Sequence, residues 1–417
     1  MKKIPFLIVL TIMLFSGCRK ERDTLTLSPS VFESVDGDGD ILKSTITCNS
    51  SWMALASDHW LSPDKSIGNG DATLTITVLP NPNGQPRQGS ITIVTDDMMD
   101  EIRVEQLPLG ADSPQNAHYT IPVIFHVLYQ NAADSRQYVD HKRLAEILAN
   151  VNKYYKGNAD SPDMNLSFVL ADTDPNGGTM TTPGVEYIRW KESYPIDCDK
   201  FMNDDTGKYT SLLWDPNNYI NVMVYNFAKT DGGITLGISH LPIIYEGNAI
   251  PGLTKYQYPH LGLDNIKFPL CASINSIYIN EESANGQYNN ADINVTTSHE
   301  LGHYLGLYHA FSEKQCSGTD YCDDTPNYDR AAYMAQFSGN KTFAELVSRQ
   351  SCDGTRFESH NIMDYDVSYA DRFTPDQRKR VRAVLNYGLM IPGPKFNPKT
   401  SGKTTYGAVD IPIVTMR

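Results

Sequence analysis

Hydrophobic and polar residues alternate in short runs between Thr24 and Pro108, and turn-forming residues separate the runs. A period of two places every second side chain on the same face of a strand, and clusters of Gly, Asn, Asp and Pro mark the turns. Regularly spaced short strands predict an antiparallel, immunoglobulin-like β-sandwich over residues 24–108. The expected strands are residues 25–27, 42–47, 73–78, 90–94 and 102–106.

From Tyr119 the pattern changes to longer apolar strands and amphipathic helices. Apolar residues recur at helical spacing within residues 140–156, which predicts a helix. A strand before this helix and strands after it predict an α/β domain with a mixed sheet backed by the helix. The strands are expected at 121–128, 166–170, 185–190 and 219–226, with extended segments at 236–242 and 273–280 and a last helix at 376–386.

Two details of this pattern bear on the site. His126 interrupts the apolar strand 121–128, and we expect it to be a packed core residue. Either 236–242 or 273–280 could form an edge strand, whose unpaired backbone groups accept an extended peptide of any sequence.

With 417 residues the chain is too long for one typical core, so at least two domains are expected. Residues 109–118 contain Gly, Asp, Ser and Pro and indicate a linker. The second domain then covers residues 119–388. The remaining segment, 389–417, is a C-terminal extension to which the pattern assigns no structure.

The N-terminus has the pattern of an export signal. Lys2 and Lys3 precede a mostly apolar run that ends at Phe15 and is too short to span a membrane as a mature helix. Ser16 and Gly17 before Cys18 resemble the lipobox of bacterial lipoproteins. Residues 1–18 are therefore expected to be a signal peptide and Cys18 the lipidated residue of an exported protein, anchored in the outer membrane and exposed at the surface. A simple secreted protein is the alternative.

Net charge and cysteine content narrow the possible binding partners and the redox compartment of the protein. The net charge of −14 argues against nucleic acid as a partner, because an acidic surface repels a phosphate backbone. Without Cys18, six cysteines remain of the seven. An even number fits disulfides in an oxidising compartment, while a buried free thiol is the alternative for Cys48.

The strongest chemical signal is the segment His299–His309, with the sequence HELGHYLGLYH. On a helix His299 and His303 lie one turn apart on the same face, so both imidazoles can bind one metal ion. Glu300 then lies beside the ion, where its carboxylate can act as the general base toward a water molecule.

The residues after the second histidine complete a three-ligand site. Gly306 is the residue type that ends a helix in the left-handed conformation, so the chain can turn and bring back His309. Three protein ligands leave the fourth tetrahedral position open, which is typical of a catalytic zinc site. The third histidine and the glycine argue against a chance HExxH match. No ligand or base is missing, which argues against a non-catalytic copy.

HExxHxxGxxH followed by Asn361-Ile362-Met363-Asp364-Tyr365 resembles the metzincin clan of zinc endopeptidases, and within it the pappalysin family. The resemblance implies an upper subdomain with a twisted mixed sheet and two helices, and a smaller, irregular lower subdomain. It implies that Met363 forms a hydrophobic floor under the zinc (Zn2+) ion and that the Tyr365 hydroxyl reaches toward the zinc or the oxyanion. Its other supporting residues are Ile121–His126, Leu305–Leu307, Asp324–Pro326 and Phe373–Thr374.

The same resemblance bears on the segment 316–352, which is expected to be largely irregular. Family members carry two disulfides in the lower subdomain and can bind calcium (Ca2+) there. Cys322 and Cys352 fit one bridge, and the second is absent or rewired through Cys316. The acidic residues that could join a calcium site, or form only a solvated acidic loop, are Asp320, Asp323 and Asp324.

The N-terminal segment resembles a BACON domain, an immunoglobulin-like module, in Asn49–Trp52, Trp60-Leu61, Arg87 and Val104–Gln106. Many relatives are suspected of binding carbohydrate or mucin, and others serve as spacers. We expect Trp52 and Trp60 to be core aromatics, so no glycan site is assigned.

Together these features predict a zinc endopeptidase that hydrolyses peptide bonds of extracellular proteins, with Glu300 as general base and then acid. Its partner is a protein or peptide substrate, and its membrane contact is a lipid anchor only. The alternative is a surface adhesin that binds glycan or mucin through the sandwich and carries a non-catalytic metal domain.

Overall fold

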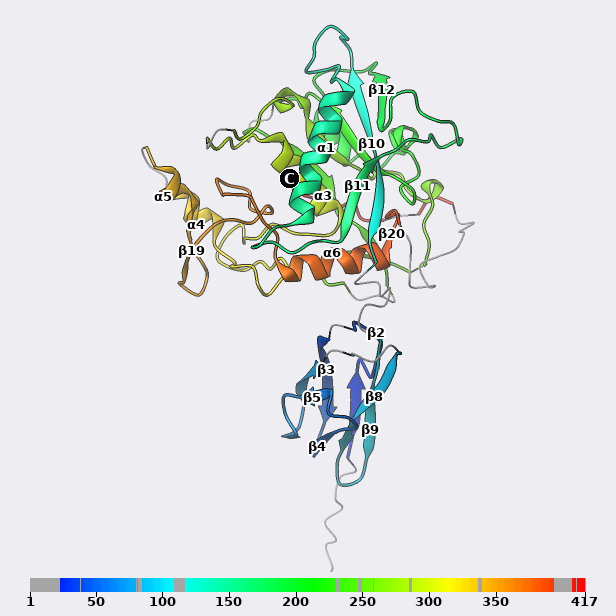
Figure 1. The fold of residues 1–417 in the computed structure, drawn as a ribbon, viewed down its shortest axis with the longest axis vertical. Helices are drawn as coiled ribbons and strands as arrows, with labels where there is room; N and C mark the ends of the chain where they lie inside the picture. The colour runs from blue at the N-terminus through cyan, green and yellow to red at the C-terminus, as the bar shows by residue number, and fades with distance from the viewer. Residues whose placement is uncertain are drawn as a thin grey trace, which may run out of the picture. The chain divides into compact units, whose positions relative to one another are not determined.

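The computed structural model describes residues 23–37, 39–79, 81, 85–108, 117–229, 233–246, 250–257, 259–284, 287–336, 340–393, 407–409 and 411–416. The predicted signal peptide with Cys18 and most of the predicted linker lie outside the described residues. The chain divides into two compact units, Met1–Ser113 and Pro114–Arg417 (Figure 1). Within the described ranges, no helix has the length and apolar content needed to cross a membrane.

The N-terminal unit consists of two β-sheets, with the strand orders β1-β3-β7-β5 and β2-β9-β8-β4-β6. Burial alternates along β3, so every second side chain faces the core, as the sequence pattern predicts. The strands are β1 (Leu25–Ser28), β2 (Val31–Val35), β3 (Asp40–Cys48), β4 (Ser51–Ala56), β5 (Leu61–Pro63), β6 (Ile67–Asn69), β7 (Ala72–Val78), β8 (Arg87–Val94) and β9 (Met99–Gln106).

Both tryptophans of this unit are buried in its core, as expected. The indole of Trp52 donates a hydrogen bond to the Gly70 carbonyl (2.9 Å), and Arg87 lies 4.2 Å over the ring of Trp60. Because these rings face inward, they provide no exposed stacking surface for a sugar. The immunoglobulin-like type of the sandwich and the binding of glycan or mucin stay predictions.

The C-terminal unit is built on a mixed sheet in the order β11-β10-β13-β17-β14-β21, with β12 also paired to β10. The pairs of β10 with β11, β12 and β13 and the pair of β13 with β17 are parallel, and β14 is antiparallel to β17. The mixed sheet is thus present. Its strands are β10 (Tyr119–Tyr129), β11 (Leu166–Leu170), β12 (Val185–Arg189), β13 (Ile220–Tyr225), β14 (Gly237–His240), β17 (Ala272–Asn275) and β21 (Thr415–Met416).

Helix α1 (His141–Lys156) packs against α3 (Ile293–Tyr304), which carries the histidine motif (Figure 1). The Asp140 carboxylate caps α1 by accepting a hydrogen bond from the Lys142 amide (2.8 Å). The Tyr155 hydroxyl of α1 donates to the Ser298 carbonyl of α3 (3.0 Å). The helix that the hydrophobic period predicts therefore holds the motif helix in place.

His126 is fully buried in β10, as predicted. Its Nδ1 lies 2.8 Å from Glu186 Oε2 and its Nε2 lies 2.9 Å from Asn221 Oδ1. Both ring nitrogens are therefore satisfied within the core, which is the usual condition for a buried polar side chain.

The short elements correct one prediction and add detail to another. Residues 276–278, expected to be extended, form a 3-10 helix after β17. The segment 316–352 is largely irregular, as expected, and contains the short elements α4 (Arg330–Met334), α5 (Phe343–Val347) and β18 (Ser348–Gln350). Asp329 caps α4, and Thr342 with Glu345 forms a capping box on α5, so local caps stabilise helices too short to show a period.

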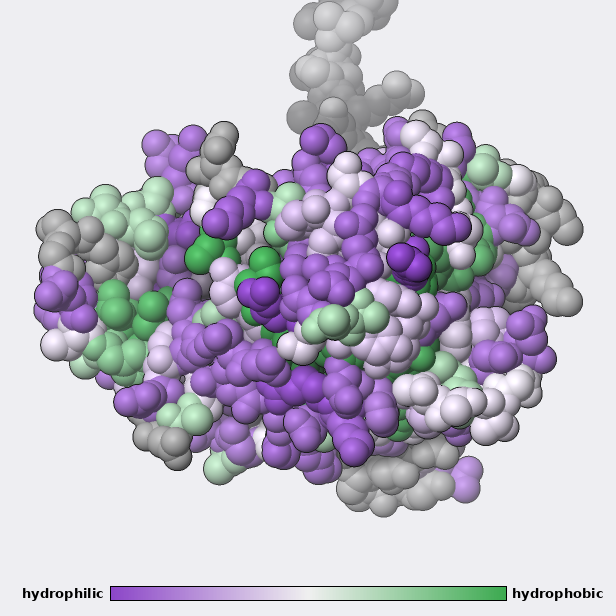
Figure 2. Space-filling model, turned by 90° about the horizontal axis from the view of Figure 1, so that it is seen from above, coloured by the Kyte–Doolittle hydropathy of each residue, from purple (hydrophilic) through white to green (hydrophobic). Residues whose placement is uncertain are grey.

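The other elements are α2 (Cys198–Met202), α6 (Pro375–Tyr387), β15 (Ile243–Tyr245), β16 (Thr254–Tyr256), β19 (Arg356–Glu358), β20 (Gly388–Leu389) and two 3-10 helices, Thr210–Leu212 and Leu263–Asn265. The predicted last helix is α6. Seen from above, the surface is mostly hydrophilic, with hydrophobic side chains in small separate patches (Figure 2). This view shows no single broad apolar face.

The disulfide prediction is wrong in its pairing. Cys316, and not Cys322, bridges Cys352, with 5.8 Å between the two Cα atoms. Cys322 is a buried free thiol close enough to Arg380 of α6 for that charge to act on its pKa, which burial raises. Cys48 and Cys271 are also free and buried, so the buried thiol is the right alternative for Cys48.

Candidate metal centre

Helix α3 begins and ends at residues suited to those positions. The Asp292 carboxylate accepts hydrogen bonds from the amides of Asn294 (2.9 Å) and Val295 (3.4 Å), which caps the first turn. After the last helical residue, Gly306 has φ 90°, as expected of the glycine in the motif. A Cβ there would lie 2.7 Å from Val384 Cγ2 of α6, so the turn is also closely packed.

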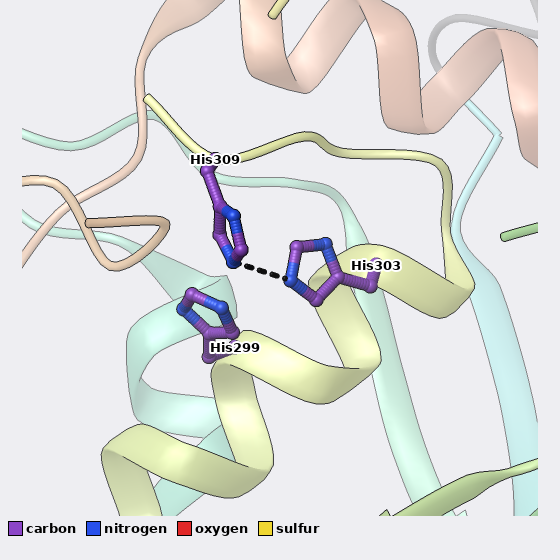
Figure 3. Close-up of side chains that lie close together, drawn as sticks. All are labelled: His299, His303 and His309. Atoms are coloured by element: carbon purple, nitrogen blue, oxygen red, sulfur yellow. Dashed lines mark hydrogen bonds between the residues drawn. The ribbon is translucent and has the colours of Figure 1, made fainter. Parts of the chain in front are cut away.

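The three histidines of the motif converge in the structure (Figure 3). His299 and His303 come from successive turns of α3, and His309 comes from the segment that returns after Gly306. One ring nitrogen of each lies within 4.8 Å of the others, and all three side chains are buried. Among the described residues, this is the only group of three or more His, Cys, Asp or Glu side chains placed to hold a metal ion.

Backbone carbonyls fix the tautomers of two of these rings. His299 Nδ1 lies 2.8 Å from the Ile362 carbonyl, and His303 Nδ1 lies 2.8 Å from the Leu307 carbonyl. A carbonyl oxygen only accepts, so each Nδ1 carries the proton and each Nε2 presents a lone pair. Burial lowers the pKa of His299 to about 4 and that of His303 well below its usual value, where the neighbouring histidines add to the effect. Both rings are therefore neutral ligands at neutral pH.

The spacing of the nitrogens fits a tetrahedral ion. His303 Nε2 and His309 Nε2 are 3.2 Å apart. Imidazole nitrogens at about 2.0–2.1 Å from a tetrahedral zinc ion are separated by about 3.3–3.4 Å, so the observed pair fits one edge of such a tetrahedron. Three imidazoles suit several transition metals, and the geometry therefore supports a metal site without selecting the ion.

Glu300 lies next to this group and is almost fully buried. Burial raises the pKa of its carboxyl group well above the ordinary value. Its Oε2 atom has no hydrogen-bond partner among the described residues. A buried polar atom without a partner is costly, so this oxygen is placed for a water molecule or an ion beside the histidines.

Gly237 of β14 lies directly against Glu300. A Cβ on Gly237 would lie 2.5 Å from both Cγ and Oε1 of Glu300, so only glycine leaves room for the carboxylate in its present position. Sequence reasoning missed this residue, because no local signal connects position 237 to position 300.

Gly237→Ala is expected to reduce kcat by about 100-fold, because shifting a catalytic group by about 1 Å costs that much. Peptide cleavage measures the effect. Gly407→Ala is the matched control, since a Cβ at Gly407 meets nothing within 4 Å. Equal activity of the two variants would contradict the importance of the close contact.

Met363 and Tyr365, in the predicted Met-turn, lie close to the helix and the histidines of the site. Met363 is fully buried, and a Cβ at Gly302 of α3 would lie 2.6 Å from its sulfur. The ring of Tyr365 meets that of His309 edge to face at 5.5 Å between centroids, and the residue is 39% exposed. Both residues are thus close to the candidate metal centre, where their roles in catalysis are proposals.

Sequence reasoning missed several residues that support the site. Phe311 stacks on His309 with ring centroids 4.7 Å apart and an angle of 10° between planes. Arg330 lies 4.6 Å over the ring of Tyr365. The aromatic Phe311, two positions after the third histidine, was the one local signal available, whereas Arg330 reaches the site only through the fold.

Strand β14 lies next to Glu300 and is the last strand of the sheet but one. On its inner side it pairs with β17, so residues 273–275 of the alternative edge segment lie inside the sheet. On its outer side it pairs with β21 at Ser239 and His240. In the described structure no strand covers the outer side of Gly237, the end of β14 that borders Glu300.

Two of the three aspartates of the calcium prediction accept hydrogen bonds from different groups of the protein. Asp320 Oδ2 accepts a hydrogen bond from the Thr325 hydroxyl (2.5 Å), and Asp324 Oδ2 accepts one from the Asp376 amide (2.9 Å). Within the described residues they do not join Asp323 in a metal-binding group. The structure gives the calcium prediction no support.

Two family models match the chain. Residues 203–386 match the peptidase M43 family, described as pregnancy-associated plasma protein-A. Residues 43–107 match the BACON family of N-terminal domains. The first match contains the histidine motif, and the second lies within the N-terminal unit.

Several curated relatives carry the name extracellular metalloprotease. The chain is 37% identical over 99 residues to such a protein of Arthroderma benhamiae, a match that covers 23% of this chain and 33% of that protein. The chain therefore spans about a third of the length of that relative. It is 27% identical over 297 residues to an extracellular metalloprotease of Neurospora crassa, covering 69% of this chain and 83% of the relative.

Among solved structures, mature mirolysin of Tannerella forsythia in complex with a cleaved peptide is 22% identical to this chain, with a TM-score of 0.44. The match covers 64% of this chain and 92% of that one. A promirolysin mutant of the same organism gives the same identity and TM-score, over 64% of this chain and 81% of that one.

Proposed function

We propose that this chain, which belongs to the pappalysin family of metallopeptidases and carries a BACON domain, is a zinc-dependent endopeptidase that cleaves extracellular proteins. The observation that supports it most is the group of three buried histidines beside the unpartnered oxygen of Glu300. A donor set of neutral imidazoles with an adjacent carboxylate is suited to hydrolysis by an activated water molecule.

His299, His303 and His309 would hold the ion. Bound there, zinc would supply a Lewis acid for a water molecule and the scissile carbonyl. Glu300 would take one proton from the attacking water and give it to the leaving nitrogen as the C–N bond breaks. The water oxygen and its second proton would stay in the new carboxyl group. The Tyr365 hydroxyl would donate a hydrogen bond to the carbonyl oxygen as negative charge develops on it.

The Met-turn and strand β14 would place these groups and the substrate. Met363 would support the histidines from below, since it packs on Gly302 of α3 and its carbonyl accepts a hydrogen bond from the Ala310 amide (3.1 Å). The free end of β14 at Gly237 would bind the peptide backbone as an added strand beside Glu300. Such binding is tolerant of sequence, which suits an enzyme that acts on many proteins.

We also propose that the protein is exported, in line with the extracellular location in the names of its relatives. This proposal includes a signal peptide at residues 1–18, lipidation at Cys18 and attachment to an outer membrane. Residues 1–18 lie outside the described residues.

Metal removal tests the proposed function. A strong zinc chelator is expected to reduce cleavage of a denatured protein to background, and added zinc is expected to restore it, because metal binding supplies the reactive water. Metal analysis of the untreated protein should find one zinc ion per chain. Cleavage that continues in the chelator, with no bound metal, would overturn the proposal.

A further inference from the structure

We propose that the cavity beside His299 and Glu300 receives an uncharged side chain of the substrate, and that Arg330 sets this preference by neutralising Asp366 in the cavity wall. The inference rests on the proposed peptidase function and names the class of residue preferred next to the cleaved bond.

The cavity has a volume of about 110 Å³ and lies between α3, the start of β14 and the segment that follows the Met-turn. His299 and Glu300 form part of its wall, so a side chain inside it belongs to a residue close to the scissile bond. For scale, a cavity of about 150 Å³ in another protein holds one benzene molecule. Apolar contacts are offered by Leu236, Val295 and Ala370.

Besides Glu300, two carboxylates line the same cavity, Asp364 and Asp366, and the first of these is fully engaged inside the protein. Asp364 accepts hydrogen bonds from the hydroxyl groups of Tyr328 (2.6 Å) and Ser359, and its Oδ2 lies 3.4 Å from Arg349 Nη2. Its side chain is only 2% exposed. Asp364 therefore has no capacity left for a substrate cation.

The second carboxylate is paired by Arg330. Arg330 Nε donates to Asp366 Oδ2 (2.9 Å) and Nη2 donates to Oδ1 (3.3 Å), which is the two-point arrangement that suits a guanidinium and a carboxylate. The side chains of Asp366 and Arg330 are 14% and 24% exposed. The pair is thus formed away from bulk water, before any substrate enters.

This pairing decides which side chains the cavity accepts. A lysine or arginine side chain entering it would lose its hydration, find Asp364 and Asp366 already paired and be repelled by the nearby guanidinium. An acidic side chain would gain no attraction from Arg330, because the Arg330–Asp366 pair has no net charge. An uncharged side chain loses little on entry and gains the apolar contacts of the wall.

The surroundings of Arg330 keep it in position. Its guanidinium lies 4.6 Å over the ring of Tyr365 and 5.6 Å over that of Phe311. Its backbone amide donates to the Ser312 carbonyl (2.9 Å) at the start of α4. Because both ends of the residue are fixed, the guanidinium stays on Asp366 and does not turn toward the substrate.

The test compares peptides that differ only in one residue beside the cleaved bond, with leucine, phenylalanine, lysine, arginine or glutamate at that place. The wild-type protein is expected to cleave the leucine or phenylalanine peptide with a kcat/KM at least about 10-fold above that of the lysine peptide, the discrimination that about 1.4 kcal/mol provides. Arg330→Gln keeps a hydrogen-bond donor but frees the Asp366 charge. It should move the lysine-to-leucine ratio of kcat/KM upward by about 10-fold or more.

Two further variants keep the test decisive. Arg136→Gln breaks a similar but exposed pair with Asp134 and should leave the ratio unchanged. Asp366→Asn removes the carboxylate and leaves Arg330 with only its longer contact to Glu313 (3.6 Å), so cleavage beside glutamate should rise while cleavage beside lysine stays low. This shift toward the acidic peptide tests the role of the Arg330–Asp366 pair even if Arg330→Gln does not fold.

The outcomes separate this inference from the proposed function. A wild-type preference for lysine or arginine overturns the inference and leaves the peptidase intact. Active Arg330→Gln and Asp366→Asn variants with the wild-type ratio overturn the role of Arg330. Wild-type protein with one bound zinc ion that cleaves none of the peptides and no denatured protein overturns the proposed function itself.

Discussion

Glu300→Gln is expected to lower kcat for peptide cleavage by about 10³-fold while the three histidines keep their metal. Glutamine has the size of glutamate, but its amide does not accept a proton at neutral pH. The attacking water therefore loses its base. The amide also fits the space beside Gly237, where the Glu300 side chain lies in contact range. The effect should therefore appear in kcat, with little change in the amount of folded protein.

The controls for this variant separate chemistry from folding. Glu246→Gln changes an exposed glutamate of the same unit and should keep full activity. Metal analysis of Glu300→Gln should give the wild-type zinc content. A Glu300→Gln protein that retains a tenth or more of the wild-type kcat would show that another group takes the proton.

The core of the candidate metal centre was predictable because it is local in sequence. His299 and His303 are one helical turn apart, and Gly306 allows the return that brings in His309, so the geometry follows from helix periodicity and one backbone conformation. The carbonyl of Ile362, which fixes the His299 tautomer, and Gly237, which leaves room for Glu300, come from distant segments. Their positions depend on tertiary packing that no local pattern encodes.

For the fold as well, features set by a long local pattern were predictable from the sequence, and other features were not. Long periodic segments such as β10 and α1 are present within a few residues of the predicted ranges. The pattern did not locate the short helices within the largely irregular residues 316–352, because helices of five residues are stabilised by caps instead of a hydrophobic stripe. Prediction failed for the pairing of Cys316, because the sequence gives the number of cysteines but not their pairing.

Arg349→Met is expected to lower the free energy of unfolding of the C-terminal unit by about 3 kcal/mol or more. The side chains of Arg349 and Asp364 are 0% and 2% exposed, so removing the cation leaves a buried carboxylate without its countercharge. Denaturant unfolding followed through the tryptophans of this unit measures the loss. Arg136→Met, which breaks an exposed pair, should cost about 0.5 kcal/mol or less.

A double variant shows whether charge is the cause. Asp364 also accepts a hydrogen bond from the Tyr365 amide (2.8 Å), so the buried pair shapes the segment that carries the proposed oxyanion donor. Arg349→Met with Asp364→Asn removes both charges and should be more stable than Arg349→Met alone, since no uncompensated ion remains. Arg349 also lies 3.7 Å over the ring of Tyr333. If the double variant is no more stable, the contribution of Arg349 comes from this packing, and the charge of Asp364 is not what holds the Met-turn.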